Sequence, residues 1–138
     1  TMPAKLRKQV ALGLEKHEDL HRAFFTYKKE DIKRTAAAME DVVRKVGISP
    51  FKRSMIAVRK DLEKLQNNNS RDKNNKIYAN ISNSLIEIVK NYDTGNGYNV
   101  YSCPMVKKKW IQNSAIRKRV HNPYAPEMPH CGQRDTDF

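Results

Sequence analysis

Apolar side chains return every three or four positions from Ala4 to Tyr92, and this spacing limits what the chain can fold into more than any other feature. The interval matches the turn of an α-helix, so each run places its apolar side chains on one helical face. The segment Ala4–Thr26 holds one glycine and no proline, which predicts an unbroken first helix. Its apolar face consists of Leu6, Val10, Gly13, Leu14, His17, Leu20, His21 and Phe24.

Start and stop signals predict three more helices. The second should run over about Glu30–Val46. Ser49-Pro50 opens the third, with the serine as N-cap and the proline in the first turn. The polar run at residues 66–69 ends it, and Ser70 restarts the chain into the fourth helix. The three apolar faces are Ile32, Ala36, Met39, Val43 and Val46; Phe51, Met55, Val58, Leu62 and Leu65; and Ile77, Ile81, Leu85, Ile88 and Tyr92.

Four helices of similar length with short connections predict an all-α fold, namely an antiparallel four-helix up-down bundle over residues 4–97. Residues 98–138 would form an irregular, Pro-rich cap packed on the bundle, so that the 138 residues make one domain. No run of about 18 consecutive apolar residues occurs, which excludes a membrane-spanning helix from the chain.

The last third of the chain differs from the rest in composition. The β-prone run Tyr98–Tyr101 is compatible with a short strand. Large side chains at Trp110, Ile111, Ile116 and Tyr124 favour a packed cap over a disordered tail. A long helix is excluded by the prolines of this segment, Pro104, Pro123, Pro126 and Pro129.

The net charge of +12 favours acidic partners in general, but it is spread along the chain, with +8 over residues 1–97 and +4 over residues 98–138. Basic runs at residues 107–109 and 117–119 flank Trp110, a pattern found in nucleic-acid-binding surfaces. No DNA-binding motif accompanies them, so a solvated surface is the preferred interpretation and nucleic acid is not an expected partner. The sequence shows no nucleophile–base pair, Gly-rich phosphate loop or paired-acid motif, and we expect no enzyme.

Sulfur side chains gather in two Pro-containing motifs of the last third. The first is Cys103-Pro104-Met105, and the second is Met128-Pro129-His130-Cys131. Thiolate and thioether ligands select soft ions such as Cu(I) and Ag(I). If the two motifs meet, they supply three or four donors to a single ion, and copper is the favoured cofactor, ahead of zinc.

A disulfide between Cys103 and Cys131 is the alternative interpretation. The two residues are 28 positions apart, and closing such a loop stabilises a fold by roughly 3–4 kcal/mol in the chain-entropy model. Met105 and Met128 would then be packing residues, as most methionines are. Reduction could convert the disulfide into the metal-binding form, so both interpretations stay open.

His17 and His21 lie four positions apart and therefore face the same side of the first helix. Two imidazoles at this spacing can hold a metal, with a third ligand from the Cys/Met cap. Their motif, His-Glu-Asp-Leu-His, superficially resembles the His-Glu-x-x-His of zinc proteases, but this small chain lacks the cleft that such enzymes need. Because both residues belong to the apolar stripe, a structural pair in the core is favoured.

The tail motifs carry a family resemblance. The segments that carry it are Tyr101-Ser102-Cys103-Pro104-Met105, Trp110, Asn122-Pro123-Tyr124, Met128 and Cys131-Gly132, together with Ile77–Leu85 in the fourth helix. Their order resembles the pattern Cys-Pro-Met … Trp-Leu … Asn-Pro-Tyr … Met-x-x-Cys-Gly of an uncharacterised bacterial domain family. That family occurs in secreted or periplasmic proteins and at the ends of membrane-fusion adaptors of copper/silver efflux pumps. Many members have Phe-Gly where Ala125-Pro126 stands here.

The resemblance implies a periplasmic or secreted bacterial protein, whose signal segment is not part of the present chain. It also implies Cys103, Met105, Met128 and Cys131 as ligands, and efflux or metallochaperone proteins as partners besides the metal ion. His130, His17 and His21 are candidates from the residues alone. The leading hypothesis is a protein that binds or hands over a Cu(I)- or Ag(I)-type ion. The alternative is a disulfide-stapled helical interaction module with no metal role.

Overall fold

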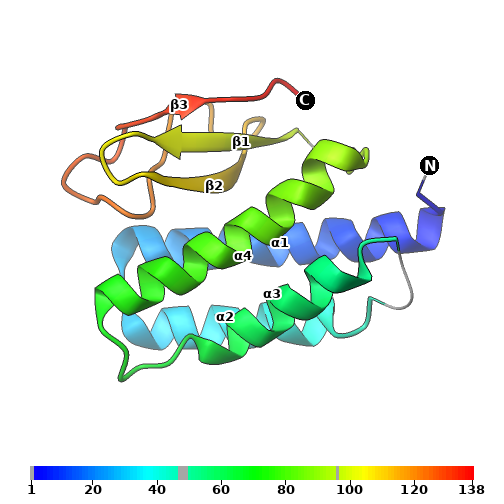
Figure 1. Ribbon diagram of the computed structural model, residues 1–138, viewed down its shortest axis with the longest axis horizontal. Helices are drawn as coiled ribbons and strands as arrows, with labels where there is room; N and C mark the ends of the chain where they lie inside the picture. The colour runs from blue at the N-terminus through cyan, green and yellow to red at the C-terminus, as the bar shows by residue number, and fades with distance from the viewer. Residues whose placement is uncertain (1, 47–49, 96) are drawn as a thin grey trace.

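The computed structural model describes residues 2–46, 50–95 and 97–138, and these form four helices and three strands. Successive helices run in alternating directions and pack in pairs, and the sheet covers one side of the layer made by the first and last helix (Figure 1). The helices are α1 (Ala4–Thr26), α2 (Lys29–Val43), α3 (Lys52–Lys64) and α4 (Arg71–Asn91), and the strands are β1 (Tyr98–Cys103), β2 (Lys108–Asn113) and β3 (Gln133–Arg134).

Local signals explain where the helices begin and end. The Ser70 hydroxyl accepts a hydrogen bond from the backbone N–H of Lys73 at 3.1 Å, which caps the start of α4. At the same end of the molecule, α1 closes on Tyr27, whose left-handed backbone lets its N–H bond to the Ala23 carbonyl oxygen. Helix α2 ends at Val43, three positions before the predicted Val46. The predicted N-cap Ser49 lies outside the described residues, and α3 begins after Phe51.

The apolar faces predicted from the sequence form the core between the helices. In α1 the exception is Leu6, which is partly buried at the edge. Val46 and Tyr92 likewise pack only partly against the core. The members that are fully buried on the later faces are Ile32, Ala36, Met39, Val43, Phe51, Met55, Val58, Leu62, Leu65, Ile77, Ile81, Leu85 and Ile88.

The all-α prediction is wrong for the last third, which forms a three-stranded antiparallel sheet in the order β2-β1-β3 rather than an irregular cap. The fold is therefore α+β. Strand β1 was indicated by its alternation, but β2 was not, because Trp110, Ile111, Gln112 and Asn113 are all buried. A strand covered on both faces loses the period-two pattern that identifies strands in a sequence.

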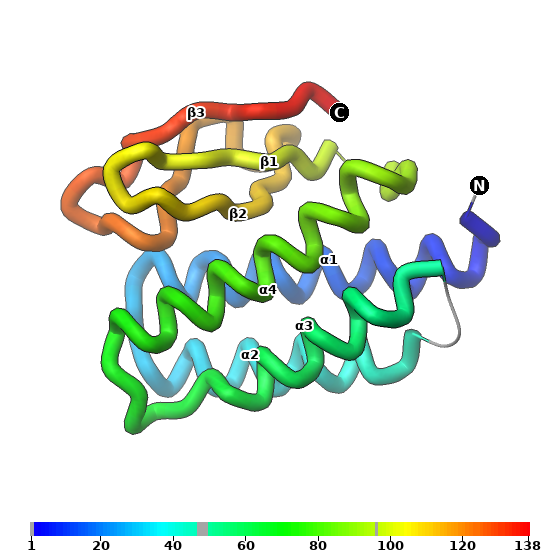
Figure 2. Tube along the Cα trace, viewed as in Figure 1, coloured from blue at the N-terminus to red at the C-terminus, as the bar shows by residue number. Residues whose placement is uncertain are grey.

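Helix α4 packs against β2, and the chain that follows β2 contacts the same strand at Trp110 and Gln112. Figure 2 traces that segment as it loops past the hairpin and returns beside β1 as β3. A chain of aromatic rings joins the layers: Phe24 of α1 stacks on Tyr78 of α4, and Tyr78 meets Tyr124 of the returning segment edge to face. Tyr124 in turn contacts Trp110 of β2. These contacts fix the sheet on the helical layer.

Within the described ranges, every helix is too short or too polar to cross a bilayer.

Gly132 permits the close approach of the returning chain to β1. A Cβ atom there would lie 2.6 Å from the Ser102 carbonyl oxygen and 3.0 Å from the Trp110 ring, and φ is +138°. We predict that Gly132→Ala lowers the free energy of unfolding by about 2 kcal/mol or more, because neither the backbone oxygen nor the conformation can yield. Urea unfolding, monitored by circular dichroism, measures this change in the free energy of unfolding.

The matched control is Gly13→Ala in α1, where the added Cβ would meet only Val43 Cγ2 at 3.7 Å. Replacing a mid-helix glycine where the new Cβ makes only an ordinary van der Waals contact should stabilise the protein by about 0.5–1 kcal/mol. Equal effects of the two substitutions would contradict the tight approach at Gly132.

Candidate functional site

The two cysteines lie next to each other at one end of the sheet. Cys103 is the last residue of β1, and Cys131 stands two residues before β3. The pairing of Ser102 with Gln133 brings the two strands together, and the Cys103 and Cys131 Sγ atoms are 3.0 Å apart. Both thiols are free, because a disulfide bond measures about 2.05 Å. The motifs around Cys103 and Cys131 therefore meet, as a shared metal site would require, at the two cysteines.

The turn after β1 surrounds the Cys103 sulfur with hydrogen-bond donors. Residues 104–107 form a tight loop in which the Lys107 N–H donates to the Cys103 carbonyl oxygen at 2.9 Å. Burial alone would raise the pKa of Cys103, but hydrogen bonds from Cys131, from the backbone N–H groups of Val106 and Met105 and from the Asn122 amide outweigh it and lower the pKa. Cys103 is therefore the sulfur of the pair that accepts negative charge most easily.

Cys131 is held by the loop that carries Asn122. The Asn122 side-chain amide donates to the Cys131 carbonyl oxygen at 3.0 Å, and its carbonyl oxygen accepts from the Tyr124 N–H at 2.9 Å. The Asn122 N–H bonds to Pro129 O at 2.8 Å. The hydrogen bond to Cys103, burial and the charge on Cys103 all raise the pKa of Cys131. Its proton therefore stays on while Cys103 ionises.

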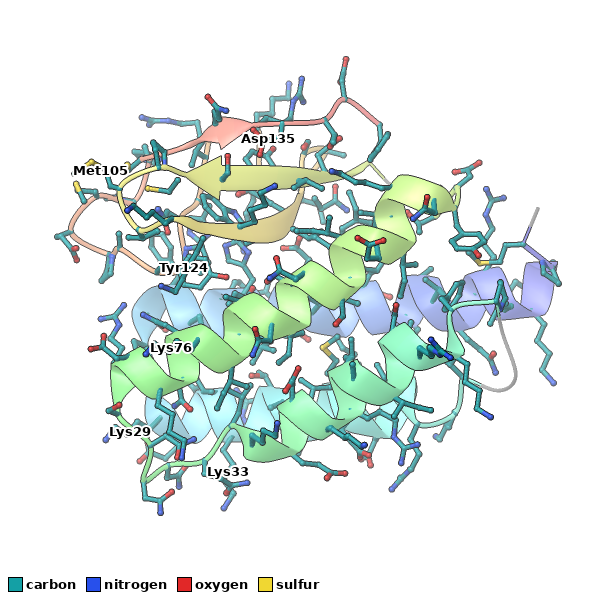
Figure 3. All side chains as sticks on the ribbon, viewed as in Figure 1. Lys29, Lys33, Lys76, Met105, Tyr124 and Asp135 are labelled. Carbon is teal, nitrogen blue, oxygen red and sulfur yellow. The ribbon has the colours of Figure 1, made fainter. Side chains whose placement is uncertain are left out.

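The thioether candidates lie in the same two loops but face solvent. Met105 is 70% exposed at the outer end of the β1–β2 hairpin (Figure 3), and Met128 is 38% exposed. His130 is also exposed, and its Nδ1 donates to Val120 O at 2.8 Å, which leaves Nε2 as the nitrogen for a ligand. Among the described residues, no group of three or more His, Cys, Asp and Glu side chains is arranged to hold a metal ion. Any further donor to the cysteine pair must therefore be a thioether, or a side chain that moves.

The candidates His17 and His21 are buried on α1, as the core interpretation predicts. The His17 ring stacks parallel on Tyr78 with a centroid distance of 5.5 Å, and neither of its nitrogens has a hydrogen-bond partner within the described part of the chain. Burial lowers its pKa to about 4. His21 Nε2 lies 2.8 Å from both Nδ1 and the carbonyl oxygen of His121. Because a carbonyl only accepts, His21 carries its proton on Nε2 and His121 Nδ1 is unprotonated.

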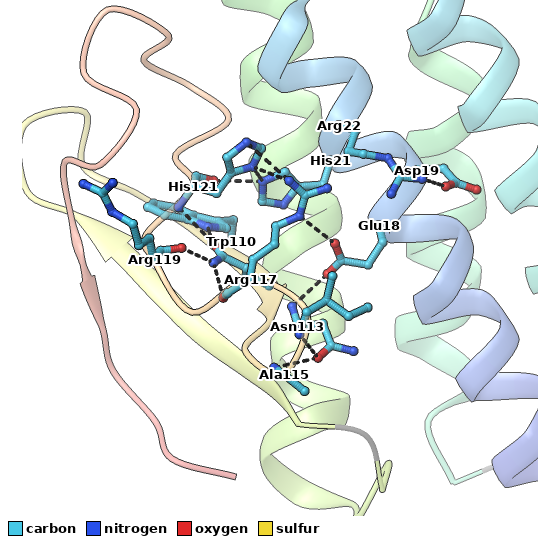
Figure 4. Close-up of polar contacts among 12 residues, drawn as sticks. Glu18, Asp19, His21, Arg22, Trp110, Asn113, Ala115, Arg117, Arg119 and His121 are labelled. Carbon is cyan, nitrogen blue, oxygen red and sulfur yellow. Dashed lines mark hydrogen bonds and ion pairs between the residues drawn. The ribbon is translucent and has the colours of Figure 1, made fainter.

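A second polar cluster, which the sequence did not reveal, joins α1 to the chain after β2; we call it the histidine junction (Figure 4). Its members are Glu18, His21, Asn113, Arg117 and His121. Glu18 is buried, accepts a 2.8 Å hydrogen bond from the Asn113 N–H and has Arg117 Nε at 3.7 Å. Burial raises the pKa of Glu18, opposed by the Asn113 hydrogen bond and the Arg117 charge.

The His121 side of the junction is packed by rings and by a cation. Phe25 stacks on His121 at a centroid distance of 3.5 Å, and Arg117 Nη1 lies 3.4 Å from His121 Nε2. Burial first, and then the charge of Arg117, lowers the pKa of His121 to about 4. A neighbouring guanidinium opposes a metal cation there, so the geometry favours a packing contact between α1 and the sheet over a metal clasp.

Comparison of the chain with protein-family models, with curated proteins and with solved structures finds no match in any of the three. The function must therefore be argued from the geometry of the two clusters.

The buried histidines make stability depend on acidity. In the folded protein, the pKa values of His17 and His121 are about 4, and burial, His121 and His17 hold the pKa of His21 well below 6.5. As the pH falls, the unfolded chain therefore binds protons at these histidines before the folded protein does. We predict that the free energy of unfolding falls as pH drops from 6.5 to 4, by about 3 kcal/mol from His17 alone. Glu18 opposes this, because its raised pKa lets the folded protein bind that proton first.

Urea unfolding at a series of pH values checks the slope. His17→Phe keeps the ring stack on Tyr78 and removes one titrating group, so its stability should change less with pH than that of the parent. Tyr78→Phe alters the same stack without a group that titrates in this range, and it should keep the parental slope. An unchanged slope in His17→Phe would show that His17 is not buried as a neutral ring.

Proposed function

We propose that this protein binds a soft monovalent metal ion of the Cu(I) or Ag(I) type and hands it over without catalysis. The observation that carries the proposal is the 3.0 Å separation of the Cys103 and Cys131 sulfurs, which are 28 positions apart in the chain. Two thiolates in contact are a ligand pair for a soft cation and a poor one for hard cations.

The electrostatics of the pair suit this role. A metal ion binds thiolates, so binding must release the protons of the two thiols. The hydrogen bonds around Cys103 already favour its charged form, and only the Cys131 proton needs to be displaced against a raised pKa. The free energy needed to deprotonate the two thiols is therefore spent mainly on Cys131.

The pair must open to admit an ion. Two metal–thiolate bonds of about 2.3 Å span up to about 4.6 Å when linear, which exceeds the 3.0 Å separation of the sulfurs. Cys103 is held in β1, whereas Cys131 is half-buried in a loop, so Cys131 is the side that moves. Met105 and Met128, exposed in the same two loops, are the further donors.

The helical part is the scaffold of this site, an up-down bundle that carries the sheet. The resemblance of the tail to a family of periplasmic and secreted proteins supports a location in the bacterial periplasm or outside the cell. Efflux proteins or metallochaperones that exchange soft ions are the matching partners. An exposed thioether such as Met105 gives a partner a first point of contact with the ion.

The second candidate is a disulfide-stapled interaction module with no metal role. The same 3.0 Å separation favours it, because the sulfurs need only a small approach to bond. In that case Met105 and Met128 would be surface residues that a protein partner covers.

Competitive Cu(I) titration of the reduced protein against a chelator separates the two candidates. We predict binding of one ion per chain, lost in the double variant Cys103→Ser/Cys131→Ser because no thiolate remains. Met105→Leu/Met128→Leu should weaken binding less, since it removes only thioethers. Any loss in His130→Ala would add that residue to the ligand set.

His17→Phe is the matched control, since it changes a buried histidine of α1 and should leave the affinity unchanged. Failure of the reduced protein to compete for Cu(I), or a double serine variant that binds as well as the parent, would refute the metal-binding proposal. A count of two reactive thiols in the native protein would refute a permanent disulfide.

A further inference from the structure

The two sulfurs of the pair differ in their access to solvent. Cys103 is 1% exposed at the end of β1, with Trp110 and Tyr101 buried beside it in the sheet. Cys131 is only partly buried, in the loop that leads into β3. A molecule approaching from solvent therefore meets Cys131 first, with Cys103 directly behind it at 3.0 Å.

We propose that Cys103 and Cys131 form a reversible dithiol–disulfide couple that exchanges with external thiols, in which Cys131 is the sulfur attacked from solvent and Cys103 is the sulfur that leaves. This activity goes beyond metal binding and does not depend on it. Its consequence for the ion, that oxidation removes both thiolates from the site, rests on the proposed function.

The exchange balances as follows. An external thiolate attacks Cys131 Sγ, the Cys103–Cys131 bond breaks, and its electron pair leaves on Cys103 as a thiolate. A second external thiol then attacks the mixed disulfide at the sulfur that came from the first external thiol, which frees Cys131 and yields the external disulfide. Two external thiols give up two electrons and two protons, and the protein disulfide becomes two thiols. In the reverse direction, Cys131 opens an external disulfide and Cys103 displaces the bound half.

The surroundings of Cys103 match a leaving group. The backbone N–H groups of Met105 and Val106 and the Asn122 amide lower the pKa of Cys103 and so favour its charged form. These donors come from the turn that follows Pro104 and from a side chain fixed at both ends, so they are in place before any bond breaks. Stabilising the departing thiolate accelerates reduction and favours the reduced form of the couple.

The surroundings of Cys131 match an attacked sulfur. Its backbone N–H bonds to Met128 O at 3.0 Å, and the Asn122 amide holds its carbonyl, so the loop presents the residue in a fixed position. Gly132, with φ at +138°, then turns the chain into β3 directly after it. The buried Cys103 lies 3.0 Å from the Cys131 sulfur, which suits it to close the disulfide and to resolve an adduct on Cys131.

The first test uses the unaltered chain at a single pH. The reduced protein is treated briefly with iodoacetamide, and alkylation at each cysteine is followed by mass spectrometry. Cys131 should react at least roughly ten-fold faster than Cys103, because the burial of Cys103 outweighs the easier ionisation of its thiol. Faster reaction of Cys103 would overturn the assigned direction of attack.

The second test uses oxidised glutathione as the external disulfide. The parent should form the internal disulfide without accumulating an adduct, and reduced glutathione should reverse it. Cys103→Ser should accumulate a glutathione adduct at Cys131, whereas Cys131→Ser should react at least roughly ten-fold more slowly at Cys103. Adduct formation at Cys103 as fast as at Cys131, or a parent that never closes its disulfide, would overturn the proposal. Circular dichroism checks that the variants are folded.

Met105→Leu/Met128→Leu separates this inference from the proposed function. It keeps both thiols, so its exchange with glutathione should match the parent even where its Cu(I) affinity falls. Exchange without Cu(I) binding in the parent would leave the couple intact and refute the metal role. Cu(I) binding without exchange would leave the metal role intact and refute the dithiol–disulfide couple.

Discussion

The packing of the sheet on the helical layer through one chain of aromatic rings is the interaction on which the rest of the structure depends. Phe24 and Tyr78 lie 4.3 Å apart between centroids, Tyr78 and Tyr124 5.7 Å, and Tyr124 and Trp110 6.0 Å. Trp110 continues the chain to Tyr101 of β1 at 5.9 Å. Each such pair is worth about 0.5–1.5 kcal/mol beyond its buried area. Because β1 carries Cys103, the ring chain fixes one half of the sulfur pair relative to the helices.

The first two thirds could be predicted from the sequence because their structure is set locally. A helix needs only a repeating apolar face and end signals, and the faces around Val58 or Ile81 are buried where the spacing places them. Strand β2 could not be predicted in this way. Gln112 is buried because its amide bonds to the carbonyls of Arg117 and Arg119 and its oxygen accepts from Trp110 and His121. A polar residue satisfied by later loops looks like a surface residue in the sequence.

The same reasoning explains which site residues were found. Cysteine and methionine are rare enough to stand out in a sequence, so Cys103 and Cys131 can be predicted as site residues from the pattern alone. Glu18 was missed, although it adjoins His17 on the apolar side of α1, because its partner Asn113 is 95 positions away. The partner of His21, His121, is 100 positions away. Chemistry that depends on two distant residues of ordinary type leaves no local pattern to detect.

Asn122 joins the two clusters of the molecule. It follows His121, whose side chain and carbonyl contact His21, and its own side chain holds the Cys131 backbone. The contact between His21 and His121 requires both rings to be neutral. His121 Nδ1 lies 2.8 Å from the protonated Nε2 of His21, so a proton on Nδ1 would place two donors against each other. The contact to His21 and the hydrogen bond that holds the Cys131 backbone are thus made by two neighbouring residues, His121 and Asn122.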